Sequence, residues 1–503
     1  MLDLSASLAI ATSGLRATEY AMGVASQNIA NAGTTGYTEE VANVRSLDVE
    51  GQGGGVASGP TGLASDMALS NAANTQNAVV ASWSVQSNAL SAIASLQGST
   101  DASSGSSATL SDELGNIQGA LISLTSTPSS TTAQNTVVSD AQTLVTSIQT
   151  LASAYQQQRQ NAQDAVVSSV NTINTDLTTI GSLSQKIMLL NAQGEDSADL
   201  ENQRDTIVSQ LSSQLSLTTQ ITSNGDMIVR TASGTVLPTH DTNAVSTDGV
   251  SDSWPLSTSS ATVDVTKAYP GTSSSNALPG IYLHGRDITA NLTGGILGAN
   301  IVLRDSTLPT MQAQLDSFSY SLATRFQFQG LPLFVSSASG VIPSGNSTET
   351  APDGLVGFAQ NISVSGSYTS DPSEIVGGSS ADDLTAVQNM LSTGFASGLS
   401  APSSGLGVNG TLSTGYDGSV GLVSLATTLT ARQAEVIDTA SSNLTTSQSA
   451  QTVLQTKLNS ATGVSVDNEM SNIVALQNAY AANAKVVAAV QSMFNDLLSA
   501  IGA

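Results

Sequence analysis

Apolar side chains recur at alternating spacings of four and three residues near the start of the chain. The positions are Leu4, Leu8, Ala11, Leu15, Thr18, Met22, Ala25 and Ile29, of which only Thr18 is polar. Such a heptad pattern is typical of a helix that packs along one narrow seam. Gly33 and Gly36 follow directly and favour the positive φ angles at which helices end. The pattern therefore predicts an N-terminal helix of about 25 residues.

The last segment of the chain repeats the same spacing to its end. The series is Val466, Met470, Ile473, Gln477, Tyr480, Ala484, Val487, Gln491, Phe494, Leu498 and Ile501. Both predicted helices carry little charge beside the seam, so each is weak alone in water but can pair with the other. Pairing places both termini at one end of the molecule. The alternative is two unrelated surface helices.

Between these helices, the apolar periodicity predicts more helices on either side of a β-containing middle. Helical patterns cover about 62–96, 110–124, 128–191, 198–215 and 299–328, and they return after about 381. Leu217–Ile221 and Met227–Val229 flank an Asn-Gly turn and predict a hairpin. The glycine-rich residues 51–55 predict an irregular loop. The fold class is therefore mainly α, with paired terminal helices, a long-helix bundle and a small antiparallel β and loop-rich region.

With 503 residues the chain is too long for one ordinary domain. Because the terminal helices pair, we expect nested domains. These are a terminal coiled-coil domain with its following loop (1–60 plus 460–503), a helical-bundle domain with a β-hairpin region at about 217–290 (61–330 plus 381–459), and a reduced outer β or loop insertion (331–380).

Charge and composition narrow the classes of partner. The chain has 38 acidic and 13 basic residues, a formal charge of −25, and no cysteine. A nucleic-acid partner is therefore not expected, and disulfides and thiolate sites are excluded. The N-terminus lacks the basic and apolar regions of a cleavable signal peptide, and no apolar run approaches the roughly 18 residues of a membrane span.

The residue types that carry catalysis do not form a recognisable pattern. His240 and His284 are the only histidines, and neither has a metal-ligating neighbour at helical spacing. The acidic residues Glu195, Asp196, Asp199 and Glu201 lack a calcium-loop pattern, and we interpret them as a solvated helix start. We therefore expect no cofactor and no enzyme activity.

The end of the first predicted helix carries a specific motif. Residues 25–31 read Ala-Ser-Gln-Asn-Ile-Ala-Asn, and residues 32–37 read Ala-Gly-Thr-Thr-Gly-Tyr. This run resembles the N-terminal signature of the flagellar rod, hook and hook-associated protein family. In it, Asn28 and Asn31 can bond backbone groups where the helix stops, Gly36 permits a tight turn, and Tyr37 can anchor the following segment. An ordinary helix end is the alternative interpretation.

Two further segments resemble the same family. Residues 200–205, Leu-Glu-Asn-Gln-Arg-Asp, are similar to a helix start in which Asn202 stands where the family usually has Asp. Asn202 keeps a side-chain acceptor, and Gln203, Arg204 and Asp205 match. Residues 464–486 resemble the family's C-terminal helix and include Asn483. The Tyr37-Thr38 pair favours a hook-associated protein over a rod or hook protein.

The resemblance implies a structural protein of the extracellular flagellum. Such a protein is exported unfolded by the flagellar type III apparatus without a cleavable signal peptide, and it assembles beneath the cap as a ring between the hook and the next junction protein. The implied partners are further copies of the chain, hook protein, hook-associated protein 3, the filament cap and an export chaperone on the C-terminal helix. No nucleic acid or membrane insertion is implied.

We expect the apolar seams to form the assembly contacts. The predicted residues are Leu4, Leu8, Leu15, Met22, Ile29, Met470, Ile473, Tyr480, Val487, Phe494 and Leu498. Two alternatives stay open, namely another flagellar axial subunit such as hook protein, and an unrelated secreted adhesin or enzyme.

Overall fold

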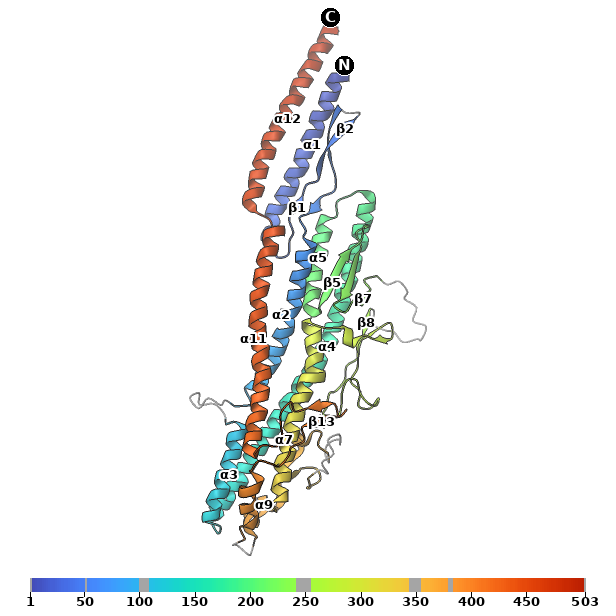
Figure 1. Ribbon diagram of the computed structural model, residues 1–503. Helices are drawn as coiled ribbons and strands as arrows, with labels where there is room; N and C mark the ends of the chain where they lie inside the picture. Colours follow the sequence, from blue (N-terminus) through green and yellow to red (C-terminus); the bar gives the residue numbers. More distant parts are fainter. Residues whose placement is uncertain are drawn as a thin grey trace. The chain divides into compact units, whose positions relative to one another are not determined.

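The computed structural model describes residues 2–49, 52–98, 108–240, 255–342, 354–378 and 383–501 (Figure 1). The described chain is mainly helical with small antiparallel sheets, as predicted. It divides into two compact units. We call Met1–Val79, Thr172–Pro255 and Gln448–Ala503 the terminal unit, and Val80–Asn171 and Leu256–Ser447 the bundle unit. The three domains expected from the sequence stay a prediction, because the two units follow different bounds.

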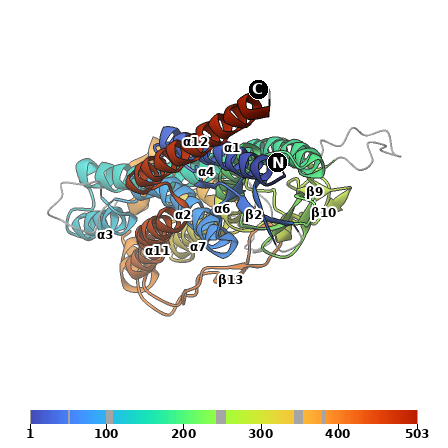
Figure 2. The same cartoon turned by 90° about the horizontal axis from the view of Figure 1, so that it is seen from above.

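The terminal unit contains the two helices predicted at the chain ends. They are α1 (Leu2–Asn31) and α12 (Val466–Ile501), which pack along each other with both termini at one end. They also lie side by side when viewed along the perpendicular direction (Figure 2). The pairing follows the prediction. The N-terminal helix is longer than expected, with 30 residues.

Other helices of the terminal unit include segments that continue into the bundle unit along the chain. The unit holds the beginning of α2 (Met67–Ala94), the end of α4 (Thr131–Gln193), all of α5 (Ala198–Gln214) and the end of α11 (Leu422–Thr462). Gly194 follows α4 with a φ of +71°, which explains why that helix ends there.

Three small sheets complete the terminal unit. β1 (Glu40–Val41) pairs with β4 (Gly62–Leu63), and β5 (Leu217–Ile221), β6 (Met227–Thr231) and β7 (Val236–Leu237) form a meander. The hairpin predicted around the Asn-Gly turn is therefore confirmed. Residues 241–254 of the predicted β region lie outside the described residues.

The prediction of an irregular loop at residues 51–55 was wrong. β2 (Val44–Val49) and β3 (Gln52–Ser58) form an antiparallel hairpin with a bulge beside Leu47. A Cβ atom on Gly55 would lie 2.4 Å from the Oγ atom of Ser13 on α1. Glycine is thus used here because the strand lies close to a helix, although glycine usually weakens strands.

The bundle unit is built from α3 (Leu110–Ser126), the first part of α4, and α7 (Leu308–Phe328), together with parts of α2 and α11. Thr109 and Asp112 form a reciprocal capping box that starts α3. α6 (Gly295–Val302) runs into α7 through the π-helical turn η3 (Leu303–Thr307). α10 (Thr385–Asn389) likewise continues into the π turn η5 (Met390–Gly394).

Short elements surround these helices. They are β8 (Leu256–Ser257), β9 (Tyr282–Leu283), β10 (Arg286–Asp287), η2 (Thr289–Asn291), β11 (Phe334–Ser336), α8 (Phe358–Asn361), β12 (Ile362–Val364), α9 (Gly366–Ser370), η4 (Pro372–Val376), β13 (Ser404–Leu406) and β14 (Leu412–Ser413). β11 pairs with β12. Residues 343–353 and 379–382 of the expected insertion lie outside the described residues.

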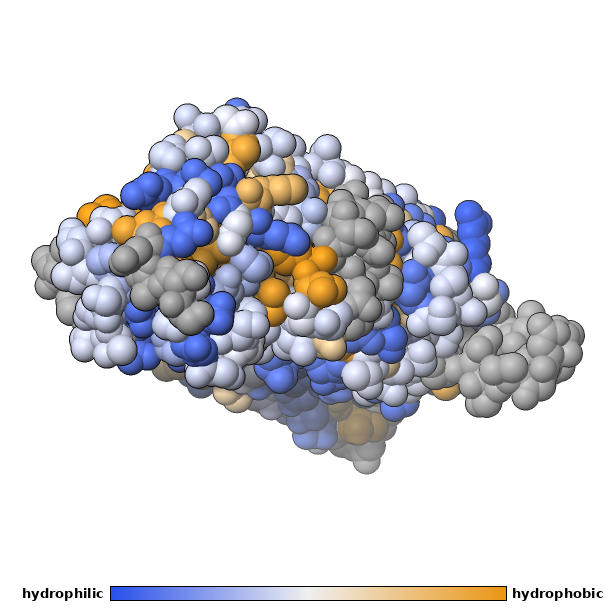
Figure 3. Space-filling view, turned by 90° about the horizontal axis from the view of Figure 1, so that it is seen from below, coloured by the Kyte–Doolittle hydropathy of each residue, from blue (hydrophilic) through white to orange (hydrophobic). Residues whose placement is uncertain are grey.

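The bundle unit has a dense apolar core. Fully buried side chains come from α3, α4, α7 and α11, and Phe334 and Phe358 from the short elements join them. Phe326 makes edge-to-face contacts with Phe334 and Phe395 at centroid distances of 5.0 and 6.0 Å. On the face drawn in Figure 3, the apolar groups of the described residues are small and separated by hydrophilic ones.

Candidate functional site

The contact between α1 and α12 follows one stripe along each helix. On α12 the side chains that are at least half-buried are Glu469, Ile473, Leu476, Asn483, Ala484, Val487, Val490 and Phe494. Gly14 on α1 permits the closest approach, because a Cβ atom there would lie 2.9 Å from the Asn483 amide nitrogen. The motif residue Asn483 thus belongs to this contact.

The stripe on α12 coincides only in part with the predicted seam. Ile473, Val487 and Phe494 are half-buried as part of it, whereas Met470, Tyr480 and Leu498 are exposed. The packed stripe uses Glu469, Leu476, Asn483 and Val490, one residue before the alternate predicted positions. On α1, the predicted residues Leu4, Leu8, Leu15, Met22 and Ile29 are all half-buried.

Many apolar side chains of α12 remain exposed. They are Val466, Met470, Val474, Tyr480, Val486, Met493, Leu497 and Leu498, which we call the exposed apolar set of α12. Within Leu422–Ala500 one window is long and apolar enough to cross a membrane by length and composition, and only 6% of it is buried. The segment contains no continuous apolar run of that length, because Asn483, Lys485, Gln491 and Asn495 interrupt it, so the sequence prediction about continuous runs is not contradicted.

The four residues Tyr37–Glu40, which we call the strap, connect the terminal helices to the rest of the terminal unit. Asn28 on α1 makes the central contacts with the strap and is 1% exposed. Its Oδ1 atom accepts hydrogen bonds from the Glu40 amide at 2.9 Å and the Tyr37 hydroxyl at 3.0 Å. Its Nδ2 atom donates to the Glu40 carbonyl at 2.8 Å and to Oε1 of Glu469 on α12 at 3.1 Å. One amide therefore joins α1, the strap and α12.

The strap also binds α5 and α11. The Thr38 amide donates to Oδ1 of Asn202 at 2.9 Å, and Nδ2 of Asn202 donates back to the Thr38 carbonyl at 3.2 Å. The Glu39 amide donates to the Thr462 carbonyl at 2.8 Å. Asn202 lies in the second turn of α5, so its role is to pair with the strap and not to start the helix. Only a side chain that both donates and accepts can make this pair.

Several carboxyl groups lie around the strap. Glu40 and Glu469 are each 5% exposed. Burial, together with Asp199 and Asp196, raises the pKa of Glu40 to about 7. Burial and the charge of Glu469 also raise the pKa of Glu39. We call these five residues, Glu39, Glu40, Asp196, Asp199 and Glu469, the carboxyl cluster.

Glu195, Asp196 and Asp199 at the acidic start of α5 are exposed, as the sequence analysis expected, and the two aspartates also accept hydrogen bonds. Oδ1 of Asp199 accepts a hydrogen bond from Gln27 on α1 at 2.8 Å. Asp196 accepts one from the Thr61 hydroxyl and caps the Ala198 amide at 3.0 Å. These carboxylates therefore fasten α5 to the strap region.

The remaining motif residues lie near the strap or in a neighbouring network. Gly36 has a φ of +83°, as its turn requires, and Asn31 donates to the Gln27 carbonyl at 3.2 Å. Arg204 is 1% exposed and donates to the Gly225 carbonyl at 2.7 Å, which ties α5 to the β5–β6 turn. Burial raises the pKa of its neighbour Asp205 to about 6. Gln203 is exposed.

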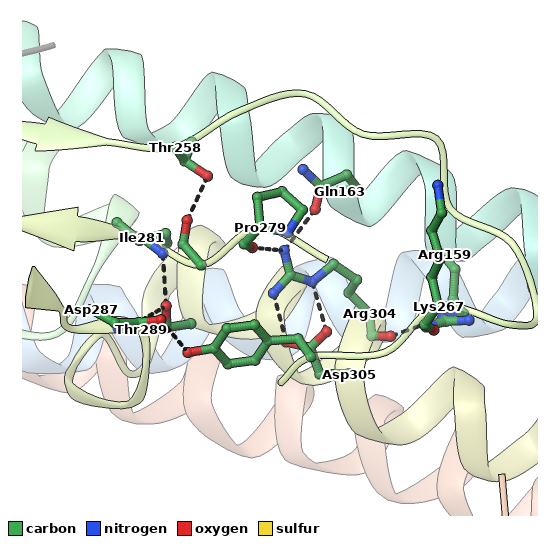
Figure 4. Close-up of polar contacts among 12 residues, drawn as sticks. Arg159, Gln163, Thr258, Lys267, Pro279, Ile281, Asp287, Thr289, Arg304 and Asp305 are labelled. Carbon is green, nitrogen blue, oxygen red and sulfur yellow. Dashed lines mark hydrogen bonds and ion pairs between the residues drawn. The ribbon is translucent and has the colours of Figure 1, made fainter. Parts of the chain in front are cut away.

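The sequence analysis missed a second polar network, which lies in the bundle unit (Figure 4). Nε and Nη2 of Arg304 donate to the two carboxylate oxygens of Asp305, each at 2.7 Å. Nη1 donates to Gln163 on α4 and to the Pro279 carbonyl. Arg159 donates to the carbonyls of Arg304, Asp264 and Lys267. Its pKa is lowered to about 10 by burial.

This network holds residues 256–292, which contain little regular structure, against α4 and η3. The guanidinium carbon of Arg304 also lies 5.5 Å from the centre of the Tyr269 ring. Neither arginine stood out in the sequence, because their partners are mainly backbone carbonyls far along the chain. The signal that was available was their rarity, since the whole chain has only 13 basic residues.

Among the described residues, no group of three histidine, aspartate or glutamate side chains is arranged to hold a metal ion. His240 shares a hydrogen bond of 2.9 Å with Asp226, and His284 occupies a turn with a φ of +49°.

Comparison with known proteins finds family matches for two parts of the chain. Residues 100–330 match the family model described as the flagellar hook-associated protein FlgK helical domain. Residues 455–500 match the model described as the C-terminal part of the flagellar basal body rod proteins FlgEFG. The helical part of the chain thus belongs to the FlgK type of flagellar hook-associated proteins, and its last helix to the flagellar rod-protein type. Proteins of the FlgK family are structural components of the flagellum.

A solved structure is similar over part of the chain. The flagellar hook junction protein FlgK from Burkholderia pseudomallei shares 24% sequence identity at a TM-score of 0.41, over 54% of this chain and 45% of that chain. The matched region is thus less than half the length of that FlgK protein. No curated protein matches the chain.

Proposed function

We propose that this chain is a structural subunit of the junction between the flagellar hook and filament, assembled through its terminal helices. The observation that carries this proposal is the exposed apolar set of α12. Eight apolar side chains of one helix are left in water although that helix already packs against α1. Exposed apolar area of this extent is typical of a protein that buries it on association.

The remaining partners follow from the family. The chain forms a ring with further copies of itself and contacts hook protein below and hook-associated protein 3 above, beneath the filament cap. It reaches this extracellular position through the flagellar type III apparatus. An export chaperone covers the C-terminal helix until export, which keeps the exposed apolar set out of water.

We propose a mechanical and not a catalytic role. The predicted assembly contacts Leu4, Leu8, Leu15, Met22, Ile29, Met470, Ile473, Tyr480, Val487, Phe494 and Leu498 support this assignment. Each of them is half-buried or exposed in the single chain, so each retains surface for a neighbouring subunit.

The deciding experiment is electron microscopy of a strain that lacks the gene, with an assay of flagellin in the medium. Hooks without filaments, with flagellin shed as monomer, are the expected result. Missing hooks would instead identify a rod or hook subunit. Intact filaments would overturn the proposal.

A matched pair of variants tests the interface itself. Leu498→Asp should prevent complementation of that strain, because it places a charge within the exposed apolar set. Leu189→Asp on α4 is the control, since Leu189 is similarly exposed but lies outside the set. Equal motility of the two strains would contradict the role of α12. Chaperone affinity that is unchanged after removal of residues 464–503 would contradict the proposed chaperone site.

A further inference from the structure

The carboxyl cluster around the strap has an unusual composition. Asp199 comes from α5, Asp196 from the turn before α5, Glu39 and Glu40 from the strap, and Glu469 from α12. α1 contributes the neutral amides of Gln27 and Asn28, and α11 contributes the Thr462 carbonyl. Tyr37 is the other titratable group. None of these carboxylates forms an ion pair within the described residues.

Glu40 is the member that burial affects most. Its backbone is fixed on both sides by Asn28, which places its side chain inside the cluster. Oε1 of Glu40 is buried and has no hydrogen-bond partner. The carboxyl also faces the negative charges of Asp199 and Asp196. A buried carboxylate that lacks a cation and faces other carboxylates is costly, and the usual remedy is protonation.

We propose that seating of the strap against α1, α5 and α12 takes up one proton from solvent, which the buried Glu40 carboxyl holds. The proton comes from water and returns to it when the strap is released. The strap is therefore bound more strongly to the terminal helices at acidic pH than at alkaline pH. This inference depends on the geometry of the strap and not on the position of the protein in the flagellum.

The direction follows from linkage between protonation and conformation. The pKa of Glu40 rises from 4.5 in the released chain to about 7 in the seated strap. The seated state therefore holds more protons between these values, so its favourable contribution is complete below pH 4.5 and is lost as pH rises through 7. A shift of this size corresponds to about a hundredfold change in the seating equilibrium, reduced by whatever solvent reaches the cluster.

Hydrogen exchange of the intact purified chain measures this equilibrium. The peptide that covers residues 28–41 contains the amides of Thr38, Glu39 and Glu40, which are bonded only when the strap is seated. Its protection, corrected for the intrinsic exchange rate, should rise at least tenfold from pH 8 to pH 5. A peptide from residues 311–326 of α7 serves as the internal reference.

Glu40→Gln is the decisive variant, because it keeps the shape of the side chain and removes its titration. The variant should show high protection that does not change with pH. Glu113→Gln is the control, since Glu113 is another buried carboxyl with a raised pKa, in the bundle unit. It should keep the wild-type pH dependence.

The pKa of Asp205 in the same unit is also raised, to about 6, so some pH dependence of protection can come from that residue. The test is therefore the difference in pH dependence between wild type and Glu40→Gln. Protection of the wild-type strap that is equal at pH 5 and pH 8 would overturn the proposal, as would a variant as pH-dependent as wild type. If Glu40→Gln fails to fold, Asp199→Asn provides the second test. It should weaken the pH dependence, and an unchanged slope would also overturn the proposal.

Discussion

The helix pair α1–α12 and the core of the bundle unit both pack apolar helix faces, but they bury these faces to different extents. In the bundle core, Phe318, Phe326 and Phe334 are fully buried and aromatic edges contact one another. On α12, by contrast, Glu469 and Val490 are the only fully buried residues in the described part of the helix. Both regions carry the apolar periodicity of helices. The bundle core is therefore complete within one chain, whereas the terminal pair leaves apolar side chains exposed, which the proposed function assigns to contacts with neighbouring subunits.

The largest expected effect tests the completeness of the bundle core. Phe318→Ala should lower the free energy of unfolding by about 3–5 kcal/mol, because it opens a cavity in a fully packed site. Phe328→Ala on the same helix is the control, since Phe328 is 79% exposed and Phe318 is 0% exposed. Urea unfolding followed by circular dichroism measures both. Similar losses in the two variants would show that the core is not as closely packed as described.

A smaller effect is expected where the terminal helices join the strap. Asn28→Ala removes four hydrogen bonds and leaves the buried Glu40 amide without a partner. We expect the strap to lose about 2–3 kcal/mol of local stability. Hydrogen exchange of residues 28–41 reports this loss. Exchange of α7 should not change, and a global loss of protection would contradict the local role.

The two reciprocal hydrogen bonds between Asn202 and Thr38 should contribute less to the local stability of the strap. Asn202→Asp retains the acceptor but cannot donate to the Thr38 carbonyl, and it adds a charge near an acidic cluster. The expected loss is about 1–2 kcal/mol, measured by the same exchange experiment. Gln203→Glu adds the same charge at the adjacent exposed position and should leave the strap unchanged. An equal effect of both variants would assign the loss to charge alone.

The smallest effect on the single chain is expected in the exposed apolar set of α12. Met493→Ser should change the free energy of unfolding by less than about 0.5 kcal/mol, because the side chain is already in water. It should nevertheless reduce motility when it replaces the wild-type gene. A large loss of stability in the purified chain would show that Met493 packs within the monomer and would weaken the contrast between the two regions.

Local patterns in the sequence predicted the terminal helices, their pairing and the hairpin at the Asn-Gly turn. They failed at residues 52–58, because a run of glycines has the composition of a loop, whereas here Gly55 permits the close approach of a strand to α1. The heptad spacing located α12, but the packed stripe lies one residue away on alternate turns. That displacement depends on the buried Glu469 and on the contact of Asn483 with Gly14, and neither is visible in a spacing pattern.

The candidate site was predictable only in part. The family motif drew attention to Asn28 and Tyr37, but their partners in the strap and on α12 depend on three-dimensional contacts. Asn202 was interpreted as part of a helix start because its side chain suits that position. Its actual partner, Thr38, is 164 positions away in the chain. Arg159 binds backbone carbonyls, which carry no sequence signature, and Arg304 binds Gln163, which is 141 positions away in the chain, besides its neighbour Asp305.

The bond between Asn28 and Glu469 joins residues 441 positions apart. Contacts of such long sequence separation form late, because the entropy of closing the intervening loop must be overcome first. In a chain delivered from its N-terminus onward, as the proposed export allows, Asn28 cannot form this bond until Glu469 has also arrived. A copy of the chain that is truncated before Glu469 therefore cannot join α1 to α12 through this bond.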